Sequence, residues 1–170
     1  MHIRLLVPSD AEAFRNLRLR GLRECPSAFA SSYEEEVTDS LLEISRRLEP
    51  KPDGAVLGAF RDGALVGIVG VQREKLKKLS HKAYVWGVYV APEARKAGIG
   101  AALIHQTLEH ARSELGVWQV MLGANTGNAA ALALYRKMGF AEYGLEKGFL
   151  LVEGVLHDEQ LMVFDVRNAL

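Results

Sequence analysis

The stretch VYVAPEARKAGIGAAL (residues 88–103) decides the fold, because it carries an apolar strand pattern directly into the start of a helix. β-Branched and aromatic residues dominate AYVWGVYV (residues 83–90), which predicts a strand that Pro92 ends. Apolar residues at helical spacing then predict a helix from about residue 99 to residue 114. A strand that leads through a glycine-containing loop into a helix is typical of folds in which helices cover a sheet.

The start of this helix has the composition of an anion-binding site. The first backbone N–H groups of a helix have no partner within it, and the helix dipole adds about half a positive charge there. Gly98 and Gly100 leave these amides open, and Arg95 and Lys96 add positive charge. Close packing of glycines against a sheet is the alternative explanation. A dinucleotide fingerprint is excluded because Leu103 stands at its third glycine, and a P-loop is excluded because no Gly-Lys pair precedes Ser or Thr.

A second informative stretch is NAAALALYRKMGF (residues 128–140). Asn128 is a good N-cap, and the apolar residues that follow share one face of a helix expected from about residue 129 to residue 138. Gly139 can end that helix in the left-handed conformation. Taken alone, Tyr135 is interpreted as a core aromatic residue with its hydroxyl at the edge, and Asn128 as a cap.

The remaining patterns predict the elements on either side. Ser9 and Glu12 form an S-x-x-E box that is expected to open an early helix, and Asp62-Gly63 is expected to form a hairpin turn. The order of the elements predicts an α/β (α+β) fold with one mixed sheet and helices on both faces. Strands are expected at residues 2–7, 55–60, 64–71, 117–122, 149–153 and 160–166, and a further helix near residues 41–48.

Composition excludes several classes of protein. With 49% hydrophobic residues, the 170-residue chain can bury one sizeable core, so we expect a single domain over residues 1–170. The 21 basic residues equal the 21 acidic ones, which disfavours binding to nucleic acid or to a membrane surface. The lone Cys25 excludes a disulfide framework and a zinc site built on several thiolates, so we expect no metal and a cytoplasmic location.

Together, the two stretches resemble motifs of the GCN5-related N-acetyltransferase (GNAT) family. The family's pattern Arg/Gln-x-x-Gly-x-Gly/Ala is met by Arg95, Gly98 and Gly100. Both motifs stand in the order and at the spacing of the family, and the predicted element order agrees with its fold. The later motif, Asn-x-x-Ala-x-x-Leu-Tyr-x-Lys-x-Gly-Phe, is met by Asn128, Ala131, Leu134, Tyr135, Lys137, Gly139 and Phe140.

The resemblance implies a mostly antiparallel sheet of about seven strands with about four helices, and acetyl-CoA as cosubstrate. In such enzymes an amine attacks the thioester directly, a backbone N–H of the strand stabilises the oxyanion, and Tyr135 would protonate the departing thiolate. The pyrophosphate would lie on the amides of residues 96–101, the pantetheine arm along the strand, and Asn128 beside it. The implied cofactor-binding residues are Val88, Tyr89, Val90, Arg95, Lys96, Ala97, Gly98, Ile99, Gly100, Ala101, Asn128 and Tyr135.

The general base is not evident from the sequence. Many relatives place a carboxylate on the strand before the glycine loop, but YVWGVYV (residues 84–90) contains no acid. Simpler interpretations exist for the acids elsewhere, namely a helix first turn for residues 34–36 and a solvated hairpin turn for residues 157–159. The candidates that stay open are Glu34, Glu35, Glu36, His81, Asp158 and Glu159.

The acceptor is expected against the early helices and the last hairpin, where acidic side chains suggest a cationic amine. The resemblance therefore predicts an N-acetyltransferase that acts on a primary amine of a small molecule, and it also suggests a homodimer. A protein or peptide N-terminal acetyltransferase and a non-catalytic acyl-CoA-binding module are the alternatives. The candidate acceptor residues are Phe29, Ser32, Tyr33, Glu34, His157 and Asp158.

Overall fold

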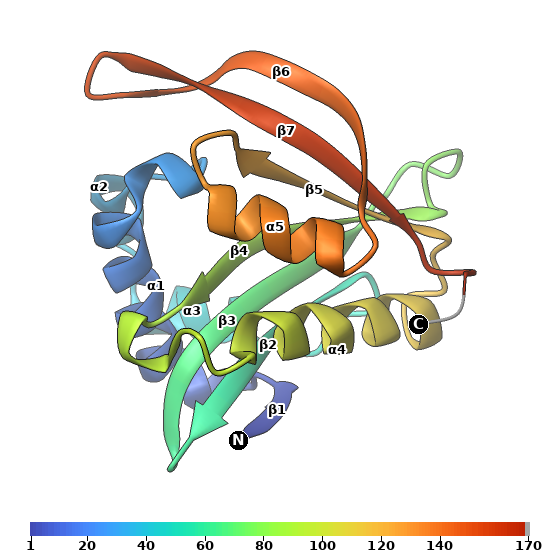
Figure 1. The fold of residues 1–170 in the computed structure, drawn as a ribbon. Coiled ribbons are helices and arrows are strands. Elements are labelled where there is room, and N and C mark those ends of the chain that lie inside the picture. The colour runs from blue at the N-terminus through green and yellow to red at the C-terminus, as the bar shows by residue number, and fades with distance from the viewer. Residues whose placement is uncertain (169–170) are drawn as a thin grey trace.

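The computed structural model describes residues 1–168, which form a seven-stranded sheet in the order β1-β2-β3-β4-β5-β7-β6 (Figure 1). Among the described strands β4 and β5 run parallel and the other neighbours are antiparallel, so the predicted mixed α/β sheet is confirmed. The strands are β1 (His2–Leu5), β2 (Gly54–Arg61), β3 (Ala64–Arg73), β4 (Lys82–Val90), β5 (Gln119–Asn125), β6 (Ala141–Val152) and β7 (Val155–Asp165).

Helices cover both faces of the sheet. Figure 1 shows α4 and α5 in front of it and α1 and α3 behind it. Two glycines allow the close approach, since a Cβ on Gly21 of α1 would lie 3.0 Å from the Tyr89 ring, and one on Gly67 of β3 would lie 2.9 Å from Leu103 Cδ1. The helices are α1 (Ala11–Glu24), α2 (Tyr33–Glu36), α3 (Leu41–Arg47), α4 (Ile99–Ser113) and α5 (Ala129–Lys137), with 3-10 turns η1 (Pro8–Asp10), η2 (Pro26–Ala28) and η3 (Pro92–Ala94).

The hairpin prediction is confirmed, whereas the predicted start of the first helix is wrong. Asp62 and Gly63 join β2 to β3 with φ angles of 52° and 81°, as a tight turn requires. Ser9 lies within η1, however, and α1 begins at Ala11. The carboxylate of Asp10 organises this corner instead: it accepts the Val7 amide at 2.9 Å and pairs with Arg4 at 2.6 Å, which holds the pKa of Asp10 below its usual value.

The last hairpin is longer than the sequence predicts. Its strands extend over Ala141–Val152 and Val155–Asp165, and the turn lies at Glu153 and Gly154. The interpretation of residues 157–159 as a hairpin turn is therefore wrong, because they lie inside β7, where successive side chains alternate between the two faces. Charged residues interrupt the apolar runs in both strands, so the apolar pattern predicts only part of each strand.

The sheet opens between β4 and β5. Their parallel pairing joins Lys82 to Gln119, Ala83 to Val120 and Tyr84 to Met121, and no later pair is formed among the described residues. In the second half of β4 the register with β3 shifts, and Gly87 there adopts a φ of +66°. The two strands therefore diverge beyond Tyr84 and leave the facing edges of both backbones without a partner strand.

Candidate functional site

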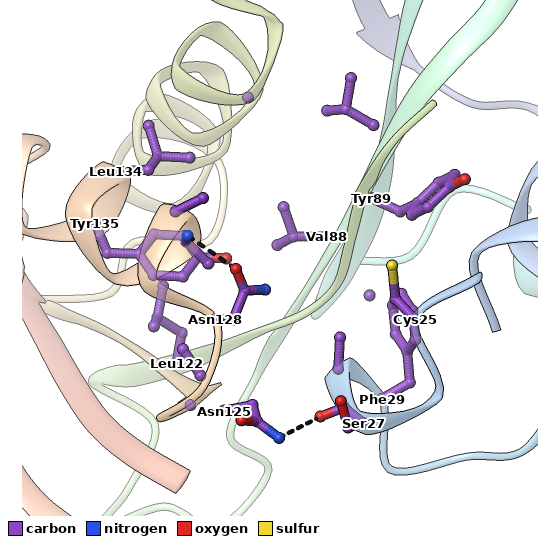
Figure 2. A pocket seen from close by; sticks show the side chains of 18 of the residues that line it. Cys25, Ser27, Phe29, Val88, Tyr89, Leu122, Asn125, Asn128, Leu134 and Tyr135 are labelled. Carbon is purple, nitrogen blue, oxygen red and sulfur yellow. Dashed lines mark hydrogen bonds between the residues drawn. The ribbon is translucent and has the colours of Figure 1, made fainter. Parts of the chain in front are cut away.

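A cavity of about 1140 Å³ occupies the place where β4 and β5 diverge. In Figure 2, Val88 and Tyr89 of β4 lie on one side of it and Asn128 and Tyr135 on the other. The cavity reaches both faces of the sheet, because its lining includes the start of α4 and α5 on one face and the η2 segment on the other. Every residue that we expected to bind the cofactor lines this cavity, with the exception of Ala97.

One end of the cavity is a row of free backbone amides. Helix α4 starts at Ile99, directly after Gly98, whose φ of +75° is a left-handed conformation. Within residues 1–168 the amides of residues 96–101 donate no hydrogen bond, and the helix ladder begins with Ala102 N–H to Gly98 C=O at 3.0 Å. Arg95 is anchored beside them by a 2.9 Å bond from Nε to the Val90 carbonyl. Free amides, a helix dipole and adjacent cations make this end suitable for a phosphate group.

The middle of the cavity is bordered by a bulged part of β4 that rests on Arg18 of α1. A Cβ on Gly87 would lie 3.3 Å from Arg18 Nη1, so the glycine allows the guanidinium to support the bulge. Arg18 is 7% exposed and is held by Glu36 and Ser31, each 2.7 Å from Nη2. Its Nη1 makes no hydrogen bond in the part of the chain that the structure describes. The bulge therefore presents its backbone to the cavity beside a buried, positively charged group.

Tyr135 of α5 faces the bulge from across the cavity. Its side chain is 5% exposed and its ring lies 5.8 Å from that of Phe140, yet the hydroxyl forms no hydrogen bond with residues 1–168. Burial raises the pKa of this phenol, and Tyr84 adds to the shift, so that it stays protonated at neutral pH. Asn128 caps α5 as predicted, with Oδ1 accepting the Ala131 amide at 3.1 Å.

The structure separates the residues that we expected at the acceptor. Phe29, His157 and Asp158 line the cavity, whereas Ser32, Tyr33 and Glu34 do not. Ser32 caps α2 together with Glu35, and the Tyr33 ring stacks under the Arg23 guanidinium at 4.0 Å. These contacts are local to the α1–α2 corner, and hold both side chains there.

The candidates for a general base are separated in the same way. Burial raises the pKa of Glu36, but its hydrogen bonds to Arg18 and Ser31 outweigh this and lower the pKa overall. Asp158 accepts Lys147 Nζ at 2.7 Å and the Gly148 amide at 2.9 Å, which lower its pKa.

Two further candidates are occupied elsewhere. Glu35 accepts the Ser32 amide at 2.7 Å. The ring of His81 lies 5.9 Å from that of Trp118 and does not line the cavity. Both groups therefore serve their own local structure.

Glu159 differs from all of these. It lines the cavity from β7, is half-buried, and its carboxylate accepts no hydrogen bond from residues 1–168. Burial, together with nearby Glu146, raises its pKa to about 7. Sequence reasoning gave Glu159 no special weight, because only the pairing of β5 with β7 brings it to the cavity.

The sequence also missed a contact at the η2 end of the cavity. Asn125 of β5 donates from Nδ2 to the Ser27 carbonyl of η2 at 2.9 Å, and Figure 2 marks this bond. It ties the η2 segment, and with it Phe29, to the wall of the cavity. No local pattern could reveal a bond between residues so far apart in the chain.

Two findings concern residues 1–168 as a whole. No helix in this range is long and apolar enough to cross a membrane. The same residues contain no group of three or more His, Cys, Asp or Glu side chains placed to hold a metal ion, and the expectation of a metal-free site stays a prediction.

Comparison with known proteins gives the family. Residues 19–140 match the acetyltransferase (GNAT) family. The chain is 30% identical over 165 residues to the "Putative ribosomal N-acetyltransferase YdaF" of Bacillus subtilis, covering 92% of this chain and 86% of that protein. It is 38% identical over 104 residues to the N-alpha-acetyltransferase RimI of Mycobacterium tuberculosis, covering 61% of this chain and 62% of that protein.

Structural comparison agrees. A GNAT-family acetyltransferase from Streptococcus pneumoniae superimposes with a TM-score of 0.84 at 23% identity, covering 96% of this chain and 98% of that one. Other relatives are named "Mycothiol acetyltransferase", from Thermobispora bispora, and "L-amino acid N-acetyltransferase AaaT", from Escherichia coli. The chain spans 45% of the length of the first protein and 71% of the length of the second. The chain therefore belongs to the GNAT family of acetyltransferases, and it is an acetyl-CoA-dependent N-acetyltransferase.

Proposed function

We propose that this enzyme transfers the acetyl group of acetyl-CoA to a primary amine of a small molecule by direct attack. The observation that carries the proposal is the continuous cavity, which joins the free amides at the start of α4 to Tyr135 and, through the opening between β4 and β5, to the face that carries η2. Donor and acceptor can thus approach the opening from different sides. Such an arrangement favours a single transfer step without a covalent enzyme intermediate.

The hydrogen-bonding groups and cations that line the cavity suit coenzyme A. The amides of residues 96–101 would bind the pyrophosphate, with Lys96 and Arg95 adding positive charge. The edge of β4 at Val88 and Val90, which has no partner strand, would take the pantetheine arm as an added strand, and Asn128, which lines the cavity, would contact that arm.

The same residues provide the chemistry at the opening. The amine nitrogen attacks the thioester carbonyl carbon, and the negative oxygen that forms accepts the Val88 N–H, close to the positive charge of Arg18. Tyr135 donates its hydroxyl proton to the sulfur as the carbon–sulfur bond breaks, so that coenzyme A leaves as the thiol. The amine gives up one proton and becomes the acetamide.

The acceptor would lie at the end of the cavity bounded by Phe29 and His157. A second candidate, the amino terminus of a polypeptide, is favoured by the name of the relative RimI. Transfer of labelled acetyl groups to peptides but not to free amines identifies this second candidate.

Release of free thiol tests the proposed function directly. The protein is mixed with acetyl-CoA and a broad panel of primary amines that includes polyamines, amino acids and amino sugars, and the thiol is titrated. We expect release to depend on at least one small amine. The absence of amine-dependent release over the whole panel, with labelled acetyl appearing in peptides, would replace the proposal with its alternative.

Gly98→Ala tests the proposed phosphate cradle, which is formed by the backbone amides of residues 96–101, and Gly116→Ala is its control. Both glycines flank α4 with positive φ angles of 75° and 62°, and both would place a Cβ in open space, but only Gly98 lines the cavity. Each change costs about 1 kcal/mol of backbone strain, so the two proteins should melt alike. We expect Gly98→Ala alone to weaken coenzyme A binding, by about tenfold, because its methyl group lies over charge-assisted amide bonds worth roughly 1.5–3 kcal/mol each. Equal affinities by calorimetry would contradict the cradle.

A further inference from the structure

We infer that Glu159 is the general base that removes the proton from the attacking amine. The inference rests on the proposed function, and it assigns a role that the sequence left open among several residues. Three observations carry it: the place of the carboxylate in the sheet, its lack of a partner, and the position of Tyr135 on the opposite face.

The sheet register places Glu159 at the opening. Glu159 of β7 pairs directly with Asn125 of β5, and cross-strand partners project to the same face. That face is the one on which η2 lies, because Asn125 bonds to the Ser27 carbonyl. The Glu159 side chain thus lies on the acceptor side of the diverging strand.

Gly123 makes room for the carboxylate. A Cβ on Gly123 would collide with Cδ and both carboxylate oxygens of Glu159, so the carboxylate lies flat against the β5 backbone at the edge of the cleft. Gly123 and Asn125 share a face by strand alternation. The strand preceding the glycine loop carries no acid, and this carboxylate reaches the opening from the other wall instead.

The surroundings leave the carboxylate available. The groups that face it are Glu146 and Tyr143 of β6, Tyr84 of β4, and His157, two residues earlier on the same face of β7. Within the described residues no cation pairs with it, in contrast to Glu36 and Asp158. Burial and the like charge of Glu146 raise its pKa to about 7, which is suited to taking a proton near neutral pH.

The two proton transfers then occur on opposite sides of the opening. As the nitrogen–carbon bond forms, the amine proton passes to the Glu159 carboxylate. As the carbon–sulfur bond breaks, the Tyr135 proton passes to sulfur, from the α5 face. Glu159 afterwards releases its proton to solvent and Tyr135 regains one, so the reaction is balanced.

Glu159→Gln tests the inference, with Glu146→Gln as the matched control. On the best acceptor of the amine panel, we expect Glu159→Gln to lower kcat by about 10²-fold at pH 8 and to leave coenzyme A affinity unchanged. In the wild type, kcat should rise with pH through about 7, since the base acts only when ionised. The profile of kcat against pH for Glu159→Gln should lack this rise and show only the ionisation of the acceptor amine. Glu146→Gln should stay active, and its rise of kcat should shift to lower pH, because the variant lacks the like charge that raises the pKa of Glu159.

The outcomes separate the two proposals. A wild type that is inactive on every amine overturns both the proposed function and the role of Glu159. If the wild type is active and the rise of kcat near pH 7 survives in Glu159→Gln, only the role of Glu159 as general base is overturned. Misfolding is not expected, because a half-buried carboxylate with a raised pKa destabilises the fold once it ionises, and the amide does not ionise. Gly123→Ala provides a second variant: its methyl group should displace the carboxylate, lower kcat and leave coenzyme A affinity unchanged.

Discussion

Tyr135→Phe is expected to lower the rate of acetyl transfer by about 10²- to 10⁴-fold, the usual contribution of a positioned general acid. The change removes one oxygen and no packing, because the ring keeps its contact with Phe140. The hydroxyl has no hydrogen-bond partner among residues 1–168, so its loss leaves no buried group unsatisfied. We therefore expect an unchanged melting temperature and unchanged affinity for coenzyme A.

Single-turnover measurement with saturating amine isolates the chemical step from product release. The leaving group offers a sharper check. Acetyl-seleno-CoA releases a selenolate, which is a weaker base than a thiolate and needs less help from an acid. The defect of Tyr135→Phe should therefore shrink with the seleno-ester if Tyr135 acts on the leaving atom, and should stay the same if the tyrosine only orders the site.

Tyr143→Phe is the control, since Tyr143 is a tyrosine of β6 that is 50% exposed and does not line the cavity. It should behave as the wild type in both assays. A Tyr135→Phe enzyme with a normal single-turnover rate would remove Tyr135 from the reaction and leave protonation of the thiolate to solvent.

The parts of the site that could be predicted from sequence are those built by neighbours in the chain. The free amides of residues 96–101 belong to a loop and the helix that follows it, so glycine spacing and the helix dipole could predict them, with close packing of the glycines as the alternative explanation. Asn128 and Tyr135 lie on one short helix, and the cap at Asn128 follows from local rules. For Tyr135 the local rules predicted only a core aromatic residue, and the family motif suggested its role.

The parts that could not be predicted depend on strand register. Glu159 is significant only because it pairs with Asn125 and covers Gly123, and neither relation is visible along the chain. The one available signal was Gly123, which directly follows the strand predicted at residues 117–122 and lies inside the observed β5, because a glycine in a strand often marks close approach of another group. The early helix shows a different failure, since Ser9 matches a capping pattern but Asp10 pairs with Arg4 and moves the helix start.

Leu103→Ala is the change with the largest expected effect on stability, about 2–5 kcal/mol, as for other fully buried leucines. Leu103 has 0% exposure and reaches β3 at Gly67, where the absence of a side chain lets α4 approach the sheet. In a chain of this size such a loss corresponds to a fall in melting temperature of roughly 5–15 °C. Leu42→Ala on α3, where the leucine is 60% exposed, should change it little.

The position of Leu103 in the first turns of α4 gives this variant a second, functional consequence. The same helix start carries the free amides, so a loosened contact at Gly67 should also weaken coenzyme A binding. Because stabilisation of the folded state by a ligand grows with the logarithm of the ligand concentration divided by Kd, the same excess of coenzyme A should raise the melting temperature of Leu103→Ala less than that of the wild type. Equal shifts would mean that the cradle is held by its own loop and not by the packing of α4 on the sheet.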